Sequence, residues 1–237
     1  MNTIKMILFD LDGTLLPMDQ DEFIAAYFYK LGKKFSDSDQ KTFIRAVQYG
    51  VAGMLQNDGS STNEEVFWRY FGQVIPDYSH YEAGFLDFYQ HEFQELAELI
   101  QPYPHVGQVI KQLKTKGYRI ACCTNPLFPQ IATYSRIKWL GIEPSEFEWV
   151  TTMENSHYSK PQLAYYQEVL DQLQLDPAVC LMVGNDVEED MGISELGVET
   201  YLITNHLINK KNLSITPTHQ GTFDDFYQFV LRLPRHE

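Results

Sequence analysis

Five short apolar runs, continuous rather than alternating, constrain the fold more than any other feature of this sequence. They cover residues 4–9, 118–123, 148–152, 179–183 and 199–204, and they are rich in Ile, Val, Leu and Cys. A run without polar alternation is typical of a strand that is covered on both faces of a sheet. The runs therefore predict a parallel sheet buried between layers of helices.

Helical patterns separate most of these runs. Apolar residues recur at helical spacing over 106–117, and the pattern stops at Gly117. A second pattern covers 161–175 and begins with Pro161, a residue favoured in the first turn of a helix. Strands that alternate with helices predict an α/β fold with a Rossmann-like open parallel sheet.

The stretch between the first two runs has a different pattern. Apolar residues have helical spacing over most of 17–101, and no strand pattern interrupts them. Two prolines in "QPYPHV", residues 101–106, indicate a linker that returns the chain to the sheet. We expect an α/β core domain of residues 1–16 and 102–237 and an all-helical cap domain of residues 17–101.

The end of the chain predicts one more element. The stretch "QGTFDDFYQFVLRL" is typical of a short closing helix, with Thr222 as its cap ahead of Asp224 and Asp225. Nothing in this helix indicates chemistry.

Composition narrows the class of partner. The 237 residues include 32 acids and 18 bases, a formal charge of −14, which argues against nucleic acid as the main partner because phosphate backbones require Lys and Arg. An anionic substrate can bind only where local cations outweigh this field. Hydrophobic residues make up 44% of the chain, enough for a packed core.

Three cysteines, Cys122, Cys123 and Cys180, lie in apolar runs without metal-binding spacing. They are typical of buried thiols in a reducing compartment. No apolar stretch reaches the length of a membrane span, and residues 1–10 do not resemble a signal peptide. The sequence predicts a cytoplasmic protein without a membrane partner, and it leaves the oligomeric state open.

Polar residues gather where the predicted strands end. In open α/β sheets, ligands bind beyond the carboxyl ends of the strands. The candidates are Asp10, Asp12, Gly13 and Thr14 after the first run, Thr124 and Asn125 after the second, Lys160 soon after the third, and Gly184, Asn185, Asp186 and Asp190 after the fourth.

Carboxylates that converge on one sheet edge repel one another and raise one another's pKa. A hard cation bound through oxygen removes this conflict, and Mg²⁺ suits a sparse set of carboxylates, waters and a substrate phosphate. Lys160, just before the predicted helix at Pro161, is unfavourable beside a helix N-terminus unless an anion meets it. Thr124 and Asn125 offer a hydroxyl and a backbone N–H for an oxyanion. Together these residues predict a Mg²⁺-assisted site for a phosphate.

Two of the carboxylates suit covalent chemistry on that phosphate. A carboxylate can attack phosphorus to form an aspartyl-phosphate, and a second one can protonate the leaving oxygen and later activate water. Residues two apart in a strand point to the same side, so Asp10 and Asp12 are expected to face one pocket.

The segments that carry these residues resemble the four motifs of the haloacid dehalogenase-like (HAD) hydrolase superfamily, in its phosphatase form. "FDLDGTLL" resembles the first motif, "CCTNP" the second, Lys160 in "SKP" the third and "VGNDVEED" the fourth. The motifs occur in the family's order and cover essentially the whole chain. The distance from Asp10 to Thr124 matches a helical cap inserted between the first two motifs.

The resemblance implies a role for each matching residue. Asp10 would be the nucleophile and Asp12 the general acid and base. Mg²⁺ would be bound by the carboxylates of Asp10 and Asp186 and the backbone carbonyl of Asp12. The remaining roles are phosphoryl binding by Thr124 and Asn125, charge stabilisation by Lys160, and orientation of Lys160 or a metal-bound water by Asp190.

The fourth motif departs from the family's usual pattern. The motif often has aspartate directly after glycine, but here Asn185 separates Gly184 from Asp186. The ligand is assigned to Asp186 because Asp190 then follows four residues later, a common spacing. Glu189 is an alternative to Asp190, and an acid here can also serve only to compensate the helix dipole.

The leading hypothesis is a Mg²⁺-dependent phosphatase that acts on a small phosphorylated metabolite. A phosphomutase is the nearest alternative, because it uses the same residues and differs in keeping water away. A dehalogenase is disfavoured because Asp12 is present. A non-catalytic regulatory protein that retains a phosphate site is the alternative from another class.

Overall fold

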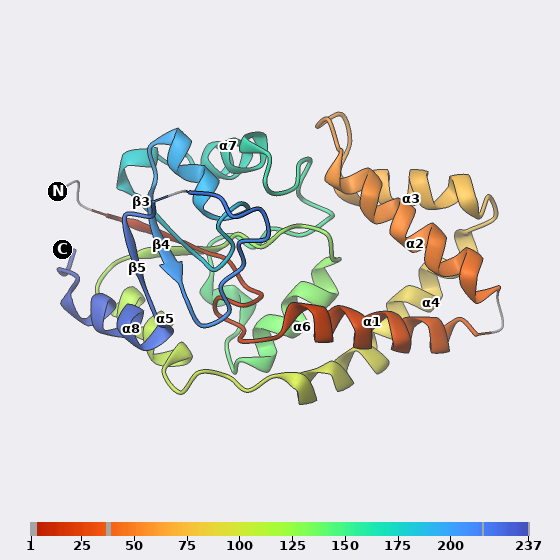
Figure 1. Ribbon diagram of the computed structural model, residues 1–237, viewed down its shortest axis with the longest axis horizontal. Coiled ribbons are helices and arrows are strands. Elements are labelled where there is room, and N and C mark those ends of the chain that lie inside the picture. The colour runs from red at the N-terminus through yellow and green to blue at the C-terminus, as the bar shows by residue number, and fades with distance from the viewer. Residues whose placement is uncertain (1–3, 37–38, 215, 237) are drawn as a thin grey trace.

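A computed structural model describes residues 4–36, 39–214 and 216–236, and its centre is a parallel sheet of five strands (Figure 1). The spatial order of the strands is β2-β1-β3-β4-β5. Their bounds are Met6–Phe9 (β1), Arg119–Cys122 (β2), Cys180–Gly184 (β3), Glu199–Ile203 (β4) and His219–Gly221 (β5). The predicted α/β class with an open parallel sheet is confirmed.

Strand β1 lies between β2 and β3, with Phe9 opposite Cys122 on one side and Val183 on the other. All four residues of β1 are fully buried. Ile7 and Phe9 pack into one apolar cluster, while Met6 and Leu8 pack into another. A strand covered on both faces is therefore apolar throughout, and the residue after Phe9 is at the carboxyl edge of the sheet.

Within the described residues, four α-helices and three short 3₁₀ helices accompany the sheet. The α-helices are Val106–Thr115 (α5), Gln130–Trp139 (α6), Leu163–Gln172 (α7) and Phe223–Arg232 (α8). The 3₁₀ helices are Pro144–Glu146 (η2), Pro177–Val179 (η3) and Met191–Leu196 (η4). Side chains of α5 and α8 pack with Ile7 and Phe9, and those of α7 pack with Met6 and Leu8, so the helices cover both faces.

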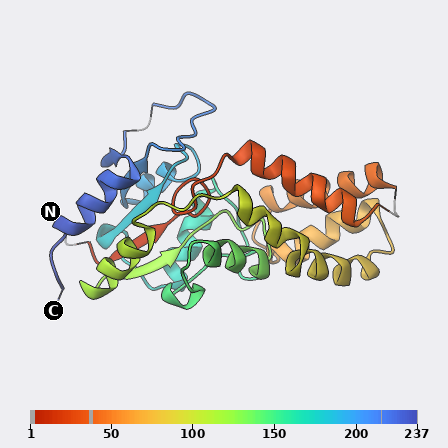
Figure 2. The same cartoon turned by 90° about the horizontal axis from the view of Figure 1, so that it is seen from below.

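The chain between β1 and α5 is helical, as predicted. It contains Gln20–Lys34 (α1), Gln40–Leu55 (α2), Asn63–Val74 (α3), Ser79–Gln90 (α4) and the 3₁₀ helix Glu92–Leu99 (η1). These helices form a second lobe beside the sheet, at the end opposite the two termini (Figures 1 and 2). Stacked and edge-on rings, such as Phe43 on Tyr81, fill the interior of this helical insert.

One predicted strand is wrong. Residues 148–152 run beside β2, but only Val150 forms a bridge, with Cys122. The chain turns away because Asn155 accepts the backbone N–H of Thr152 and donates to the carbonyl of Val150. The fifth strand is β5, where the sequence predicted no strand, and its Gln220 and Gly221 open the stretch that was interpreted as the closing helix. The strand has only three residues and they form no apolar run.

One predicted helix start is wrong and one predicted helix cap is confirmed. Pro161 does not open a helix, since α7 begins at Leu163 after Gln162 in extended conformation. The predicted cap of the closing helix is confirmed, because Thr222 and Asp225 form a reciprocal capping box on α8. The three cysteines are buried and free, as expected. Among the described residues, no helix has the length and hydropathy of a membrane span.

Candidate active site

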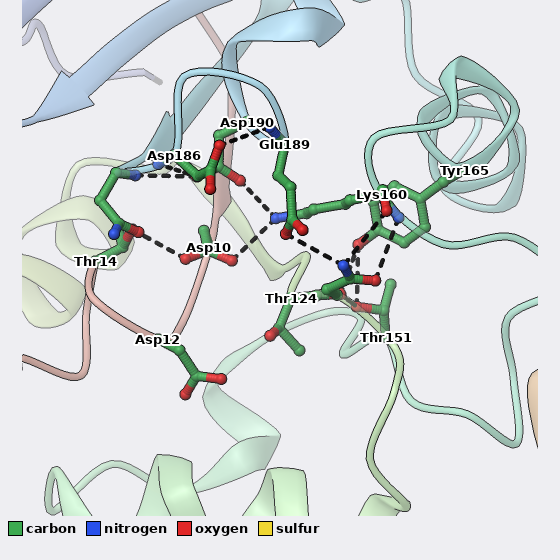
Figure 3. Close-up of polar contacts among 12 residues, drawn as sticks. Asp10, Asp12, Thr14, Thr124, Thr151, Lys160, Tyr165, Asp186, Glu189 and Asp190 are labelled. Atoms are coloured by element: carbon green, nitrogen blue, oxygen red, sulfur yellow. Dashed lines mark hydrogen bonds and ion pairs between the residues drawn. The ribbon is translucent and has the colours of Figure 1, made fainter. Parts of the chain in front are cut away.

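Asp10 follows β1 directly, and two neighbouring side chains bond to its carboxylate (Figure 3). The Lys160 ammonium donates to Oδ1 at 2.9 Å, and the Thr14 hydroxyl donates to Oδ2 at 3.0 Å. Thr14 also contacts Oδ1 of Asn185, 2.9 Å away. Asp10 is only 7% exposed, so these contacts fix the orientation of a nearly buried carboxylate.

Lys160 connects Asp10 to a second acid. Its ammonium donates to Oδ1 of Asp190 at 2.6 Å, and the side chain is fully buried. The ammonium also lies 5.9 Å from the centre of the Tyr166 ring. Burial lowers the pKa of Lys160, but the carboxylates of Asp10 and Asp190 raise it by a larger amount. The net pKa is therefore well above its ordinary value. Lys160 is therefore a fixed positive charge between two acids.

Asp190 is oriented from three sides. Besides Lys160, its carboxylate accepts the backbone N–H groups of Asn185 and Asp186 at 3.0 and 2.9 Å. A Cβ on Gly184 would lie 2.3 Å from the Asp190 side chain, so glycine at this position makes room for the acid. Burial raises the pKa of Asp190 to about 7, against the lowering effect of Lys160.

The second strand contributes Thr124 and Asn125. The Thr124 carbonyl accepts the hydroxyls of Thr151 at 2.7 Å and Tyr165 at 2.9 Å, which anchors the turn after β2. The Asn125 amide accepts the backbone N–H of Lys160 at 3.2 Å. These bonds join the turn after β2 to the segment that carries Lys160.

Asn125 also contacts Glu189, the alternative to Asp190 as the acid that orients Lys160. Its amide nitrogen donates to Glu189 at 3.1 Å. Burial raises the pKa of Glu189 to about 8. Lys160 hydrogen-bonds to Asp190, whereas Glu189 bonds to Asn125, so the geometry supports Asp190 as the acid that orients the lysine.

Asp186 is the second residue after β3, and backbone N–H groups of the same loop hold its carboxylate. Oδ1 accepts the N–H groups of Glu188 and Glu189 at 2.8 and 3.0 Å. The Asp186 N–H in turn bonds to Asp190. Asp186 is thereby linked to Asp10 through Asp190 and Lys160, on the same edge of the sheet (Figure 3).

Asp12 points away from the Asp10 and Lys160 pair, in contrast to the expected shared pocket (Figure 3). The strand ends at Phe9, so strand alternation does not extend to Asp12. Its Oδ2 forms an ion pair with Arg136 of α6. Burial raises the pKa of Asp12, and Arg136 lowers it.

Arg136 is a site residue that the sequence reasoning missed. Its side chain is fully buried, donates to Thr133 at 3.2 Å and lies 4.5 Å from the centre of the Phe128 ring. The detectable signal was an arginine on the apolar face of a helix, next to Ile137 and four residues after Ala132. A cation at such a position requires a buried partner.

The donor set at the sheet edge fits a hard cation. Asp10 and Asp186 offer carboxylate oxygens there and Asp12 offers a backbone carbonyl, and oxygens of these kinds are the ligands that Mg²⁺ takes. The described part of the chain has no cluster of three or more His, Cys, Asp or Glu side chains that would bind a metal unaided. A Mg²⁺ ion held by two carboxylates, one backbone carbonyl, waters and substrate is compatible with this, because Mg²⁺ keeps several waters.

A parallel sheet carries acids and a buried lysine at its carboxyl edge, and comparison with known families shows which class of protein has this arrangement. The family model of the haloacid dehalogenase-like hydrolases matches residues 4–197. The chain belongs to this family, and the predicted membership is confirmed.

Two of the relatives identified by sequence are named as phosphatases. A glyceraldehyde 3-phosphate phosphatase of Methanothermobacter thermautotrophicus is 28% identical over 126 residues, which cover 50% of this chain and 54% of that protein. The chain thus spans about half the length of this relative. The pyrophosphatase PpaX of Bacillus mycoides is 24% identical over 85% of this chain and 84% of its own length. These names agree with the phosphatase form of the family that the motifs predicted.

Solved structures support the fold. A HAD phosphatase from Thermococcus onnurineus aligns with a TM-score of 0.61 over 98% of this chain and 100% of its own, at 19% identity. At this identity the likeness bears on the fold alone. The alignment covers both the sheet and the helical insert.

Proposed function

We propose that the protein is a Mg²⁺-dependent phosphatase that hydrolyses a small phosphorylated metabolite through an aspartyl-phosphate on Asp10. The observation that carries the proposal is the Asp10 carboxylate, held between Lys160 and Thr14 beyond strand β1. Family membership and the named phosphatases among the relatives support the same reaction class.

The first half of the reaction transfers the phosphoryl group. An Asp10 oxygen attacks phosphorus, and the bond from phosphorus to the leaving oxygen breaks. Asp12, released from its ion pair with Arg136 and protonated, gives its proton to that oxygen. Lys160 offsets charge on Asp10 and the phosphoryl group. The Thr124 hydroxyl and the Asn125 backbone N–H are the proposed contacts of the phosphoryl oxygens. Asp190 keeps Lys160 in position.

The second half returns the enzyme to its starting state. Asp12, now ionised, accepts a proton from water as the water oxygen attacks phosphorus. The bond between phosphorus and Asp10 breaks, inorganic phosphate leaves, and Asp10 is again a carboxylate. The carboxylates of Asp10 and Asp186 and the carbonyl of Asp12 would hold Mg²⁺, which supplies positive charge next to the phosphoryl oxygens.

We also propose the division into a core of residues 1–16 and 102–237 and a cap of residues 17–101. All the proposed site residues belong to the core, and the helical insert packs beside them through α3 and the turn after β2. A cytoplasmic location is supported by the three free thiols. The charge of −14 supports a small-molecule rather than a nucleic-acid partner.

The test is phosphate release from a panel of phosphorylated metabolites, with Mg²⁺ and with excess chelator. We expect release that requires the metal, and loss of at least about a thousandfold in kcat for Asp10→Asn, which removes the nucleophile but keeps the shape of the side chain. Asp171→Asn, on the surface of α7, is the control and should match the wild type.

Two outcomes separate the alternatives. Isomerised sugar phosphates without free phosphate would replace hydrolysis by a phosphomutase reaction. Tight binding of phosphorylated compounds with no turnover of any would favour a regulatory protein. Substantial activity in Asp10→Asn would remove Asp10 as the nucleophile.

A further inference from the structure

A large cavity lies where the helical insert meets the core, apart from the catalytic carboxylates. Its volume is about 640 Å³, within the range of small-molecule sites. Helices α1 to α4 form its walls, and residues 127–131 and 153–154 of the core close one side. Asp10, Asp12 and Lys160 are not among the described residues that line it. The cavity is therefore not the proposed phosphate site.

The walls of the cavity are mainly aromatic. Seven of the described lining residues carry aromatic rings, among them Tyr27, Trp68, Phe85 and Phe128. The rings hold one another in place: the centres of Tyr27 and Phe128 are 5.4 Å apart, and those of Trp68 and Phe85 are 5.7 Å apart. Aromatic faces carry partial negative charge, so this lining favours an apolar body and also attracts a cation.

The charged groups around the cavity are all acids. Glu64 of α3, Glu82 of α4 and Glu154 of the core line it, and its described lining contains no Lys, Arg or His. Burial raises the pKa of Glu64, and the charges of Glu154 and Glu82 raise it further. These glutamates are thus close enough to repel one another. An anionic ligand would add to this repulsion, whereas a cationic ligand would relieve it.

Neighbouring cations do not neutralise Glu64 or Glu82. Within the described residues, the ion pairs of the insert join Lys30 to Glu95, and Lys34 to Asp87 and Glu92. Glu64 and Glu82 take part in none of the ion pairs found there.

Two further contacts involve Glu154 of the cavity wall and the buried Arg136. Glu154 accepts the backbone N–H of Gln130 with both oxygens, at 2.8 and 3.0 Å, and so stays fixed at the cavity. Arg136 touches the ring of Phe128 but is paired with Asp12.

We propose that this cavity binds an organic cation, a protonated or quaternary amine carried on an aromatic or branched aliphatic body. The rings take the body, and Glu64, with Glu82 and Glu154 beside it, faces the charge. Both features select against the neutral and anionic analogues of the same body.

The ligand has two possible sources, and one of them rests on the proposed phosphatase function. Asn125, in the turn of the phosphate site, and Phe128, in the cavity wall, are three residues apart, a span of at most about 11 Å. An amine-bearing phosphate ester can therefore place its cationic end in the cavity. The other source is a separate amine that does not react.

Isothermal titration calorimetry with three matched probes tests the proposal. The probes are 2-phenylethylammonium, 2-phenylethanol and 3-phenylpropanoate, which share a ring and a short chain and differ in charge. We expect the ammonium to bind about tenfold or more tightly than the alcohol, because a cation–π contact of ordinary strength raises the affinity by about this factor. The carboxylate should bind most weakly. Equal affinities, or tighter binding of the carboxylate, would overturn the proposal.

A pair of charge-removing variants locates the effect. Glu64→Gln keeps the shape of the side chain, and Glu98→Gln removes the same charge from an exposed position on η1. We expect Glu64→Gln to reduce the affinity for the ammonium about fivefold or more and to leave the alcohol within about twofold. Retained alcohol binding also shows that this variant is folded. Equal losses in both variants would assign the preference to bulk charge and contradict the proposal.

Enzyme kinetics then distinguishes the two sources. Competitive inhibition by the ammonium, with a higher KM for amine-bearing phosphate esters in Glu64→Gln, identifies the cation as part of the substrate. Binding that is unchanged by saturating inorganic phosphate, with non-competitive inhibition, identifies a separate ligand. If no phosphatase activity is found, the calorimetry still decides the proposal, so the two failures are distinguishable.

Discussion

Single residues at the site are held by partners that leave them little freedom, and Arg136 is the clearest case. Its guanidinium is fully buried and paired with Asp12, whose side chain is 21% exposed. Arg136→Met removes the cation and leaves the carboxylate without it. Breaking a buried ion pair on one side costs about 3 to 5 kcal/mol, and the partial exposure of Asp12 places the expected loss near 3 kcal/mol.

Urea unfolding measures this loss as a change in the free energy of unfolding. The double variant of Arg136→Met with Asp12→Asn should lose less than the sum of the two single variants, since the second change removes the unpaired charge. Strict additivity would contradict a direct coupling between the two side chains.

The same residue shows what the sequence could and could not predict. Asp10, Lys160, Asp186 and Asp190 lie at or soon after the ends of apolar runs, so the rule for parallel sheets predicts that they meet at one edge. Arg136 lies inside a helix and meets Asp12 only through tertiary packing. Its role depends on which face of α6 points towards the first loop, and helical spacing alone does not determine that.

Among the elements, α3 connects the helical insert to the core through its first residue. Asn63 is fully buried, and its amide nitrogen donates to the carbonyls of Pro126 at 3.2 Å and Tyr158 at 3.1 Å. The backbone N–H of Glu64 bonds to Met153 of the core. The bond to Pro126 reaches the residue that follows Asn125, so this helix end holds the turn of the phosphate site.

Asn63→Asp is expected to loosen this contact. The variant replaces a donor with a charged acceptor that faces two carbonyls, and losing such buried bonds costs about 2 kcal/mol. Hydrogen exchange of residues 125–128 should become faster. Gln73→Glu, which adds the same charge at an exposed position of α3, is the control. Equal exchange in both variants would mean that Asn63 does not hold the turn.

The capping box of α8 gives a prediction about pH. Asp225 accepts the hydroxyl and the backbone N–H of Thr222 at 2.7 and 2.9 Å, and these bonds hold the pKa of Asp225 below its ordinary value. A carboxyl whose pKa is depressed in the folded state stabilises the fold above its unfolded pKa and loses this effect as pH falls through its folded pKa.

Asp225→Asn should therefore lower Tm at pH 7 by a small amount, and the difference should shrink in acid and disappear as pH falls through the lowered pKa of Asp225. Thermal unfolding of both proteins across this pH range measures the difference. A constant difference at every pH would show that the charge of Asp225 is not its cause.

At the scale of elements, length decided which predictions were correct. The buried runs and long amphipathic helices had enough periodic residues to be recognised, including the helical stretch up to residue 100. Strand β5 has only three residues and lies at the sheet edge, and residues 148–152 have strand-like composition but leave the sheet after one bridge. The position of a strand in the sheet and the number of residues that pair with its neighbour depend on the assembled sheet. A local sequence pattern does not determine either of them.

The whole molecule carries an excess of 14 negative charges, and several of its acids lie at one sheet edge with Lys160 between Asp10 and Asp190. A cation that binds only the folded site stabilises the fold by mass action, by about 2.7 kcal/mol at a hundredfold excess over Kd. For a chain of this size, that corresponds to a rise in Tm of about 5 to 10 °C on addition of Mg²⁺.

Thermal unfolding in MgCl₂, against NaCl of equal ionic strength, separates this effect from general screening of the acidic surface. Asp186→Asn should keep a cooperative transition without metal and lose most of the rise, because it removes one of the two proposed carboxylate ligands. Asp171→Asn removes the same charge from the surface of α7 and should retain the full rise. If NaCl reproduces the effect, or Asp186→Asn keeps it, the metal does not bind at the sheet edge, and the acids there are balanced by Lys160 and backbone N–H groups alone.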